Sequence, residues 1–166
     1  MFEIKFELEM LFNEDVYKFM YAALQEAETA LQKDEVPIGA VIVHHNRIIG
    51  RGYNQTELLK DSTAHAEMIA ITSAANHLQS KFLDECDLYV TVEPCVMCTG
   101  AILLSRIKRI YFGTFEPKFG ACGSLYNLAD DGKYNHKPEV YSGVYADESK
   151  YLLESFFKTK RISENK

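Results

Sequence analysis

The sequence predicts an α/β fold, a three-layer α/β/α sandwich in which a five-stranded mixed sheet carries helices on both faces. The predicted elements follow the order α-β-β-α-β-α-β-β-α, and strands that alternate with helices form a sheet covered on both sides. The chain has 166 residues, of which 47% are hydrophobic and 25% are charged, a size and composition typical of one globular domain. We therefore predict a single domain over residues 1–166, without an internal repeat or linker.

The first third of the chain predicts a helix followed by a β-hairpin. Apolar residues recur every three or four positions over residues 13–33, the pattern of a helix with one buried face, and Asn13 is of a type that caps helix N-termini. An apolar run at 37–43, a polar turn and a second run at 48–52 predict two paired strands. Residues 53–63 are polar and irregular, which predicts a loop.

The rest of the chain predicts three more helices and three more strands. They are a helix at 64–79, a strand at 87–92, a helix at 93–105, a strand at 108–113, a loop at 114–123, a strand at 139–145 and a helix that ends near 161. Pro94 stands at a position that the first turn of a helix permits. Asp147 is expected to cap the last helix.

Charge, cysteine content and hydropathy exclude several classes of protein. The net charge of −6 argues against a nonspecific nucleic-acid binder, and four cysteines are too few for a disulfide scaffold. No apolar run approaches the length of about 18 residues that a membrane span needs, and the acidic N-terminus does not resemble a secretory signal. We therefore expect a cytoplasmic protein without a membrane partner. Residues 150–166 carry five basic and two acidic residues, which form either a solvated tail or a phosphate-contacting patch.

Two short segments predict a metal site. Cys95 and Cys98 are three residues apart at the start of a predicted helix, so their sulfurs share one face, and a helix N-terminus favours thiolates. His65 also opens a helix and is the best candidate for a third ligand. Three such ligands suit zinc and leave its fourth position open for water, as in catalytic zinc sites. Glu67 then stands beside the metal without binding it, where its carboxylate can take up a proton.

These and other cysteines and histidines also have interpretations that do not involve catalysis. A CxxC pair alone is equally consistent with redox thiols or with half of a structural zinc finger, although the sequence offers no second CxxC or HxxxH pair. Cys86 and Cys122 are expected to be buried free thiols. His77 is expected to be packed or solvated within its helix, and His44 and His45 are expected to be exposed at the hairpin turn.

Taken together, His65-Ala66-Glu67 and Pro94-Cys95-Val96-Met97-Cys98 resemble the signature of the zinc-dependent nucleoside and nucleobase deaminases. Longer stretches are similar to the bacterial tRNA-specific adenosine deaminases, which convert the wobble adenosine of an anticodon to inosine. These stretches are EVPIGAVIV from Glu35, DSTAHAE from Asp61, LYVTVEPCVMCTGA from Leu88 and GACGS from Gly120. The resemblance covers about residues 13–161, implies a cytidine deaminase-like fold and leaves residues 1–12 as an N-terminal extension.

The resemblance implies a role for individual residues. His65, Cys95 and Cys98 would bind one Zn²⁺ per subunit, a zinc-activated water would attack C6 of adenine, and Glu67 would be the proton shuttle. The residues that would bind the flipped-out base are Pro37, Ile38, Gly39, Asn54, Ala66, Glu93 and Pro94. The residues that would contact the tRNA anticodon stem-loop are Glu116, Lys118, Asn135, His136, Phe156, Lys158, Lys160 and Arg161. Members of the family are homodimers in which both subunits contact the substrate, so the resemblance also implies a homodimer.

One loop departs from the family pattern. The family usually has Asp-Pro-Lys followed by a small residue, whereas this chain has Glu116-Pro117-Lys118-Phe119. The longer acid and the aromatic ring fall in the loop that is expected to meet the nucleic-acid backbone. The departure leaves the zinc chemistry unchanged and affects how the anticodon loop is recognised.

Two other functions remain open at this point. A deaminase of free nucleobases, such as guanine or cytosine, would share the zinc motif, but it would not need the loop at 120–124 or a basic last helix. A zinc-stabilised binding module without catalytic activity is the other alternative. Glu67 argues against that module, because a structural zinc site has no use for an unligated carboxylate beside the metal.

Overall fold

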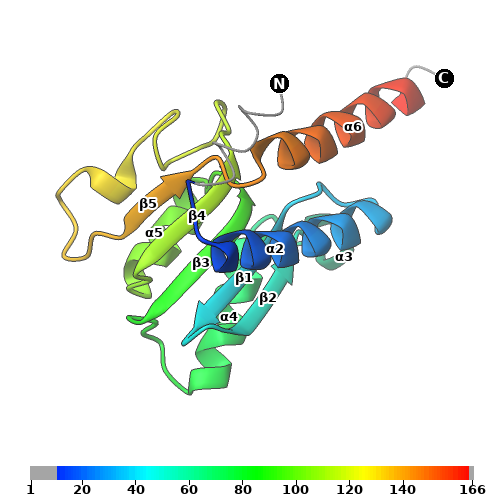
Figure 1. Ribbon diagram of the computed structural model, residues 1–166. Helices are drawn as coiled ribbons and strands as arrows, with labels where there is room; N and C mark the ends of the chain where they lie inside the picture. The colour runs from blue at the N-terminus through cyan, green and yellow to red at the C-terminus, as the bar shows by residue number, and fades with distance from the viewer. Residues whose placement is uncertain (1–10, 165–166) are drawn as a thin grey trace.

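The computed structural model describes residues 11–164, in which five strands form one mixed sheet (Figure 1). The strands are β1 Gly39–His44, β2 Arg47–Tyr53, β3 Cys86–Val92, β4 Arg109–Thr114 and β5 Glu139–Ser142. Their spatial order is β2-β1-β3-β4-β5. β1 is antiparallel to both of its neighbours, whereas β3, β4 and β5 run parallel to one another. The predicted five-stranded mixed sheet is therefore confirmed.

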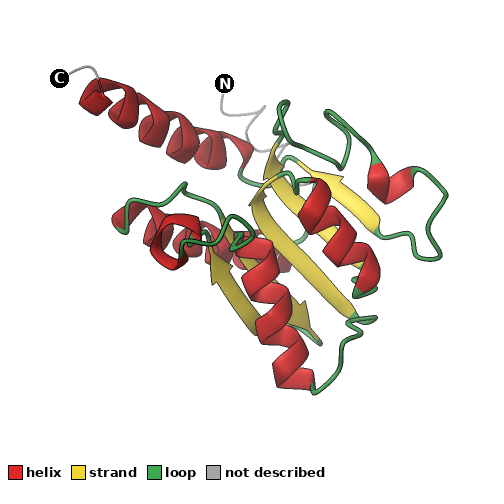
Figure 2. Cartoon of the chain, turned by 180° about the vertical axis from the view of Figure 1, so that it is seen from behind, coloured by secondary structure: helices red, strands yellow, loops and turns green. Residues whose placement is uncertain are grey.

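Helices cover both faces of the sheet and complete the predicted three layers (Figure 1, Figure 2). The helices are α2 Glu14–Gln32, α3 Thr56–Leu59, α4 Ala66–Leu78, α5 Val96–Leu104 and α6 Ala146–Glu164. α2 lies on one face of the sheet, and α4 and α5 lie on the other. α6 begins on the face that α2 covers, in contact with β4, and then extends past the edge of the sheet.

Small residues bring α4 close to the sheet. Ala66, Ala70 and Ala74 are fully buried on one side of α4 and belong to the larger hydrophobic core. A Cβ atom at Gly52, in β2, would lie 2.2 Å from the carbonyl oxygen of Ala66. Only glycine permits this close approach of a strand to a helix backbone. Gly52 therefore helps to fix the position of the N-terminus of α4, which follows His65 directly.

Two segments differ from the prediction, and the first of them depends on a residue distant in sequence. The predicted loop at 53–63 contains the short helix α3, whose backbone N–H groups of Glu57 and Leu58 donate to the Glu35 carboxylate at 3.1 and 2.6 Å. Because Glu35 lies more than 20 residues earlier in the chain, a local sequence pattern could not predict this helix. A 3₁₀ helix at Leu128–Asp130 also lacks a prediction.

The ends of several elements shift by a few residues. The helix predicted from residue 93 begins at Val96, because Cys95 has the extended backbone of an N-cap. The strand predicted to reach residue 145 ends at Ser142, because Gly143 has a left-handed φ of 93°. Asp147 lies in the first turn of α6 and not at its cap, so that prediction is wrong. At that position, its charge still complements the positive end of the helix dipole.

The start of α2 agrees with the prediction. Asn13 caps the helix, because its Oδ1 accepts a hydrogen bond from the backbone N–H of Val16 at 3.1 Å. The first ten residues of the predicted N-terminal extension lie outside the described residues, and its last residue, Phe12, packs edge-on against the rings of Tyr17 and Tyr111. No helix within residues 11–164 is long and apolar enough to cross a membrane.

Candidate metal centre and substrate site

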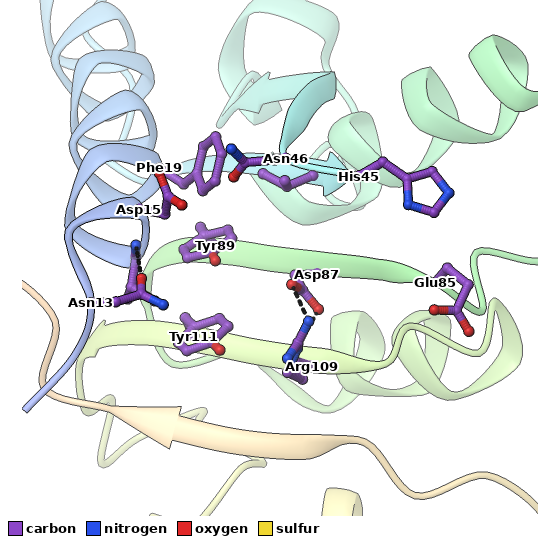
Figure 3. A pocket seen from close by; sticks show the side chains of 12 residues that line it. Asn13, Asp15, Phe19, His45, Asn46, Glu85, Asp87, Tyr89, Arg109 and Tyr111 are labelled. Atoms are coloured by element: carbon purple, nitrogen blue, oxygen red, sulfur yellow. Dashed lines mark hydrogen bonds and ion pairs between the residues drawn. The ribbon is translucent and has the colours of Figure 1, made fainter.

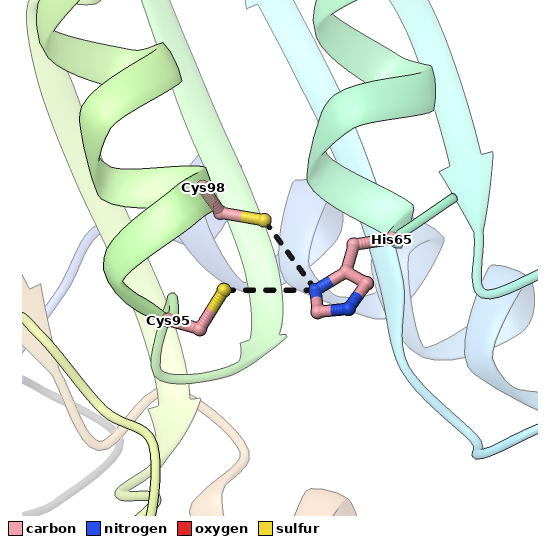
Figure 4. A group of neighbouring side chains, drawn as sticks. All are labelled: His65, Cys95 and Cys98. Carbon is pink, nitrogen blue, oxygen red and sulfur yellow. Dashed lines mark hydrogen bonds between the residues drawn. The ribbon is translucent and has the colours of Figure 1, made fainter. Parts of the chain in front are cut away.

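The two predicted metal-binding segments meet at one end of the sheet (Figure 4). His65 directly precedes α4, whereas Cys95 is the N-cap of α5 and Cys98 lies in its first turn. α4 and α5 pack against each other on the same face of the sheet (Figure 2). Because α5 follows the C-terminal end of β3, the site lies beyond that end of the strand.

The three side chains are spaced like ligands of one tetrahedral ion. Nδ1 of His65 lies 3.6 Å from Sγ of Cys95 and 3.6 Å from Sγ of Cys98, and all three ligand atoms lie within 4.8 Å of one another. Zinc bonds of about 2.3 Å to sulfur and about 2.0 Å to nitrogen, at tetrahedral angles, separate N from S by about 3.5 Å. The spacing and the donor types therefore fit Zn²⁺ with three protein ligands and one position for another ligand.

The pKa values of the two thiols are shifted in opposite directions, and that of Cys95 favours cation binding. The pKa of Cys95 is lowered to about 4, because its thiolate accepts a hydrogen bond from Cys98 and a weaker one from His65. The pKa of Cys98 is raised, because Cys98 donates that hydrogen bond and is buried. The lowered pKa of Cys95 makes its thiolate available to a divalent cation, which binds the deprotonated form of cysteine.

Glu67 is a buried carboxyl group beside these ligands. It lies in the first turn of α4 with only 4% of its surface exposed, and it does not belong to the group of three that could share an ion. Burial raises the pKa of Glu67 to about 7. The residue therefore stands where the sequence pattern places it, next to the ligands but outside their set.

The residues predicted to contact the base gather around Asn54. The backbone N–H of Asn54 donates to the carbonyl oxygen of Ile38 at 3.1 Å, and its side-chain Oδ1 accepts from the N–H of Ala66 at 3.3 Å. Pro37 and Gly39, on either side of Ile38, are buried. Asn54 thus links the start of β1 to the N-terminus of α4, and the structure brings these predicted residues together.

Glu93, also predicted to bind the base, directs its carboxylate at a loop. Its Oε2 accepts from the N–H of Glu116 at 2.9 Å and from the hydroxyl of Ser124. Its Oε1 accepts from the backbone N–H groups of Cys122 and Ser124 at 3.0 and 2.9 Å. The carbonyl of Pro94 accepts one more hydrogen bond from the same loop. These two residues therefore tie the end of β3 to the loop that follows β4.

A groove of about 1180 Å³ lies between α3, α6, the end of α2 and the loop after β4. Among the eight predicted tRNA contacts, those that line it are Glu116, Lys118, Phe156, Lys160 and Arg161. One contact links the groove to the metal-binding segment, because its wall residue Glu116 donates a backbone hydrogen bond to Glu93, two residues before Cys95. Glu35 and Leu58 also line the groove. Neither residue was predicted to belong to the site, because the hydrogen bond that brings them together joins positions 23 residues apart and leaves no local sequence pattern.

The other three predicted tRNA contacts lie outside the groove lining. Lys158 is exposed on α6, and Asn135 is exposed in the loop before β5. The ring Nε2 of His136 pairs with the carbonyl oxygen of Ile107 at 2.6 Å. Ile107 precedes β4, whereas the metal ligand Cys95 follows the far end of the parallel strand β3. Within one chain, His136 therefore lies at the end of the sheet opposite to the metal centre.

A separate hollow of about 250 Å³ lies on the face that α2 covers (Figure 3). Asp87 and Arg109 on its floor form an ion pair with N–O distances of 2.7 and 3.0 Å. The rings of Tyr89 and Tyr111 stack beside this pair with their centroids 4.7 Å apart. None of the predicted site residues lines this hollow.

The remaining cysteines and histidines lie largely as expected. Cys86 and Cys122 are buried free thiols, and burial raises their pKa values to about 11 and about 12. His77 is exposed in the last turn of α4, and His45 is exposed at the hairpin turn. His44 is only half-exposed, and its ring centroid lies 4.0 Å from that of His45.

Known proteins are similar to this chain in both sequence and fold. The family model of the cytidine and deoxycytidylate deaminase zinc-binding region matches residues 13–114. The tRNA-specific adenosine deaminase of Aquifex aeolicus (strain VF5) is 46% identical over 145 residues, which cover 86% of this chain and 94% of that protein. A solved structure from a study of A-to-I editing by tRNA:A34 deaminases at the wobble position has a TM-score of 0.79 and 46% identity, covering 82% of this chain and 99% of that chain.

A guanine deaminase from Bacillus subtilis is less similar. Its structure has a TM-score of 0.58 and 37% identity, and the match covers 63% of this chain and 66% of that chain. The tRNA-specific relative therefore shares more of its length and more of its sequence with this chain. The chain belongs to the tRNA-specific adenosine deaminases, within the zinc-binding cytidine and deoxycytidylate deaminase family.

Proposed function

We propose that this protein is a zinc-dependent hydrolase that converts adenosine to inosine at the wobble position of tRNA anticodons. One observation carries the proposal: the buried Glu67 lies beside His65, Cys95 and Cys98, whose spacing fits a single ion. A structural zinc site has four protein ligands, whereas a catalytic site keeps one position open. The group within residues 11–164 offers three ligands and an unligated acid, the arrangement that hydrolysis requires.

The chemistry divides between zinc and the chain. One zinc ion per subunit, when bound, supplies an activated water and stabilises the negative charge that develops during attack. Glu67 takes a proton from the attacking water and delivers it to N1 of adenine. Glu67 then carries the second proton of that water from the oxygen on C6 to the amino group, which leaves as ammonia. One water is consumed, the C6–N bond breaks, and a C6–O bond takes its place.

The base is received next to the N-terminus of α4. Adenine stacked in an anticodon loop does not expose C6 to the site, so the nucleotide turns out into the pocket. Pro37, Ile38 and Gly39 form the wall under the base, and Ala66 closes the side next to the zinc ligands. Because the Oδ1 of Asn54 is held by the N–H of Ala66, the amide nitrogen of Asn54 is the group that contacts the base.

The rest of the anticodon stem-loop follows the groove between α3 and α6. Besides five acids, Asp34, Glu35, Glu57, Glu116 and Glu154, the lining of this groove holds four basic side chains, Lys33, Lys118, Lys160 and Arg161, and Lys158 adds a fifth on α6. These side chains contact phosphates, so the affinity for RNA falls with added salt even though the chain is acidic overall.

We assign the exposed face of α5 to a second copy of this chain. Val96 and Leu104 lie on this face at helical spacing, and Leu125 and Tyr126 are exposed in the loop after β4. We take these exposed apolar residues as the interface, because larger exposed apolar surfaces mark sites of protein–protein contact. In a homodimer, His136, which lies far from the metal centre of its own chain, is available to the substrate bound by the partner. The same interface supports the α5 helix that carries Cys98.

We place the protein in the cytoplasm as a single domain. The two zinc-binding thiols, Cys95 and Cys98, need a reducing environment to stay free of disulfides. The substrate RNA is also found in that compartment. No membrane partner is needed for the reaction.

A deaminase of free guanine is the second candidate, favoured by the similarity to the guanine deaminase of Bacillus subtilis. That enzyme class needs only a pocket for one base. The groove of about 1180 Å³ between α3 and α6 exceeds what a single base fills, and it favours a polymeric substrate. The two candidates therefore differ in which substrate releases ammonia.

The direct test offers the purified, zinc-loaded protein three substrates: an anticodon stem-loop with adenosine at the wobble position, free adenosine and free guanine. We expect inosine to form at that position of the stem-loop, with ammonia released in equal amount. A stem-loop with guanosine at the wobble position is the negative control. Ammonia released from guanine, without inosine in the RNA, would overturn the proposal.

A further inference from the structure

The loop after β4 is clamped on both sides of Phe119. Before it, the backbone N–H of Glu116 donates to Glu93, and after it, the N–H of Gly120 donates to the carbonyl oxygen of Glu116 at 2.7 Å. A Cβ atom at Gly120 would lie 2.2 Å from Oε2 of Glu93, so the loop passes directly over this buried carboxylate. The backbone that presents Phe119 is therefore fixed relative to the metal centre.

The ring of Phe119 is nevertheless exposed. Two-thirds of the residue (66%) is accessible to solvent, and the residue lines the groove between α3 and α6 together with Phe156 and Phe157. A side chain this exposed contributes little to the hydrophobic free energy of folding. The stability of the chain therefore does not account for a large aromatic ring at this position.

Charged side chains of both signs surround Phe119. Lys118 precedes it in the loop, and Arg161 lies on another wall of the same groove. The acids of the lining are each bonded within the chain: Glu35 accepts backbone N–H groups of α3, Glu116 accepts the N–H of Lys118, and Asp34, Glu57 and Glu154 pair with Lys160, Lys60 and Lys150. Sites that bind single-stranded nucleic acid usually combine aromatic rings with basic side chains.

We propose that Phe119 stacks on a nucleobase that flanks the target adenosine. The inference rests on the proposed function, because it takes the anticodon loop as the occupant of the groove. Every base has a π-face, so stacking raises the affinity for RNA without reading one sequence. Phe119 acts on substrate binding and takes no part in the proton transfers of Glu67.

A second copy of the chain is the competing occupant. The groove mixes aromatic residues with Lys33, Lys118 and Arg161, whereas the exposed face of α5 gathers apolar residues such as Leu104. An interface between copies of the chain favours the more apolar surface. The groove is therefore assigned to RNA, and the oligomeric state of each variant decides against the alternative.

The first experiment separates binding from chemistry. Phe119→Leu removes the ring and keeps an apolar side chain, whereas Phe119→Trp keeps a ring. For deamination of the stem-loop, we expect Phe119→Leu to raise KM about tenfold and to leave kcat within about twofold of the parent value, since aromatic stacking contributes mainly to affinity. Phe119→Trp should restore KM. Tyr151→Leu, which removes an exposed ring from α6 outside the groove, should change neither constant.

The second experiment locates the stacked base. The chain contains no tryptophan, so Phe119→Trp provides a single fluorescent reporter and Tyr151→Trp a matched control. Titration with the stem-loop should quench the first reporter and leave the second unchanged. In stem-loops that lack one flanking base at a time, one position should abolish the KM difference between the parent protein and Phe119→Leu. That position identifies the base that Phe119 contacts.

The outcomes distinguish this inference from the proposed function. If the parent protein forms no inosine in the stem-loop, the proposed function fails. If inosine forms but Phe119→Leu keeps the parent KM, or the fluorescence of Phe119→Trp and of Tyr151→Trp responds equally to RNA, the stacking inference alone is wrong. A change of molecular mass in Phe119→Leu, measured by light scattering at the assay concentration, would assign the groove to a second copy instead.

Discussion

At Glu67 the chain places an acid where burial opposes its charge. The residue is almost fully buried, and its pKa is raised to about 7. Such a position is unfavourable for folding unless function requires it, because a buried carboxyl group without an ionic partner destabilises the folded state. His65, two residues earlier, caps the same helix end. A single turn of chain thus supplies both a metal ligand and a proton carrier.

The first prediction removes the acid and keeps its shape. Glu67→Gln should retain zinc, because the three ligands are untouched, and should lower kcat for the stem-loop by about 10²–10⁴-fold, the usual contribution of a general acid–base group. Metal content is measured by elemental analysis and kcat by inosine formation. Glu28→Gln, an exposed substitution on α2, is the matched control and should change neither quantity. Near-normal turnover of Glu67→Gln would refute the role of Glu67.

At the scale of elements, the contact between β2 and α4 sets the position of the metal ligand His65. Fully buried alanines and Gly52 let the helix approach the strand backbone. α5 meets α4 on the same face, which brings Cys98 to within 3.6 Å of His65 Nδ1. The distance between the sheet and the layer of α4 and α5 therefore determines the geometry of the metal site.

The second prediction disturbs that spacing. Gly52→Ala places a Cβ atom 2.2 Å from the carbonyl oxygen of Ala66, so α4 has to shift. We expect the free energy of unfolding to fall by about 1–3 kcal/mol and the affinity for zinc to decrease. Denaturant unfolding and competition with a zinc chelator measure the two effects. Ser73→Ala, on the exposed side of α4, should be almost neutral; equal effects from both variants would contradict this packing argument.

Local patterns could predict most elements and the metal ligands, but not the walls of the site. The periodicity of residues 13–33 and the cap at Asn13 depend on neighbours in the sequence, and α2 appears where they place it. His65, Cys95 and Cys98 can be predicted as metal ligands from their residue types and their spacing in the sequence. The helix α3 and the clamped loop depend instead on Glu35 and Glu93, whose partners lie more than 20 residues away. Contacts between residues this far apart cannot be predicted from a local sequence pattern.

At the scale of the whole molecule, the exposed face of α5 suggests how two chains associate. Leu104 is 81% exposed at the end of a helix whose other side is buried in the core. Such a residue is unfavourable at a surface that faces water alone. A homodimer would cover it and would place two metal centres near the same interface, since Cys98 lies on that helix.

The third prediction tests this association. Leu104→Asp should reduce the molecular mass in solution from twice 18.9 kDa to 18.9 kDa, because a charge at the centre of an apolar interface opposes assembly. Light scattering coupled to gel filtration measures the mass. Ile162→Asp, on the exposed part of α6, should leave the dimer intact. A parent protein that is already monomeric at micromolar concentration would contradict the homodimer.

The coordination of the metal tests the central claim most directly. Zinc X-ray absorption of the purified protein should show two sulfur ligands at about 2.3 Å, one histidine nitrogen at about 2.0 Å and one light atom from a non-protein ligand. Cys95→Ser should reduce the sulfur count to one. A fourth protein ligand, or a protein that retains no zinc while folded, would contradict the account of an open catalytic site.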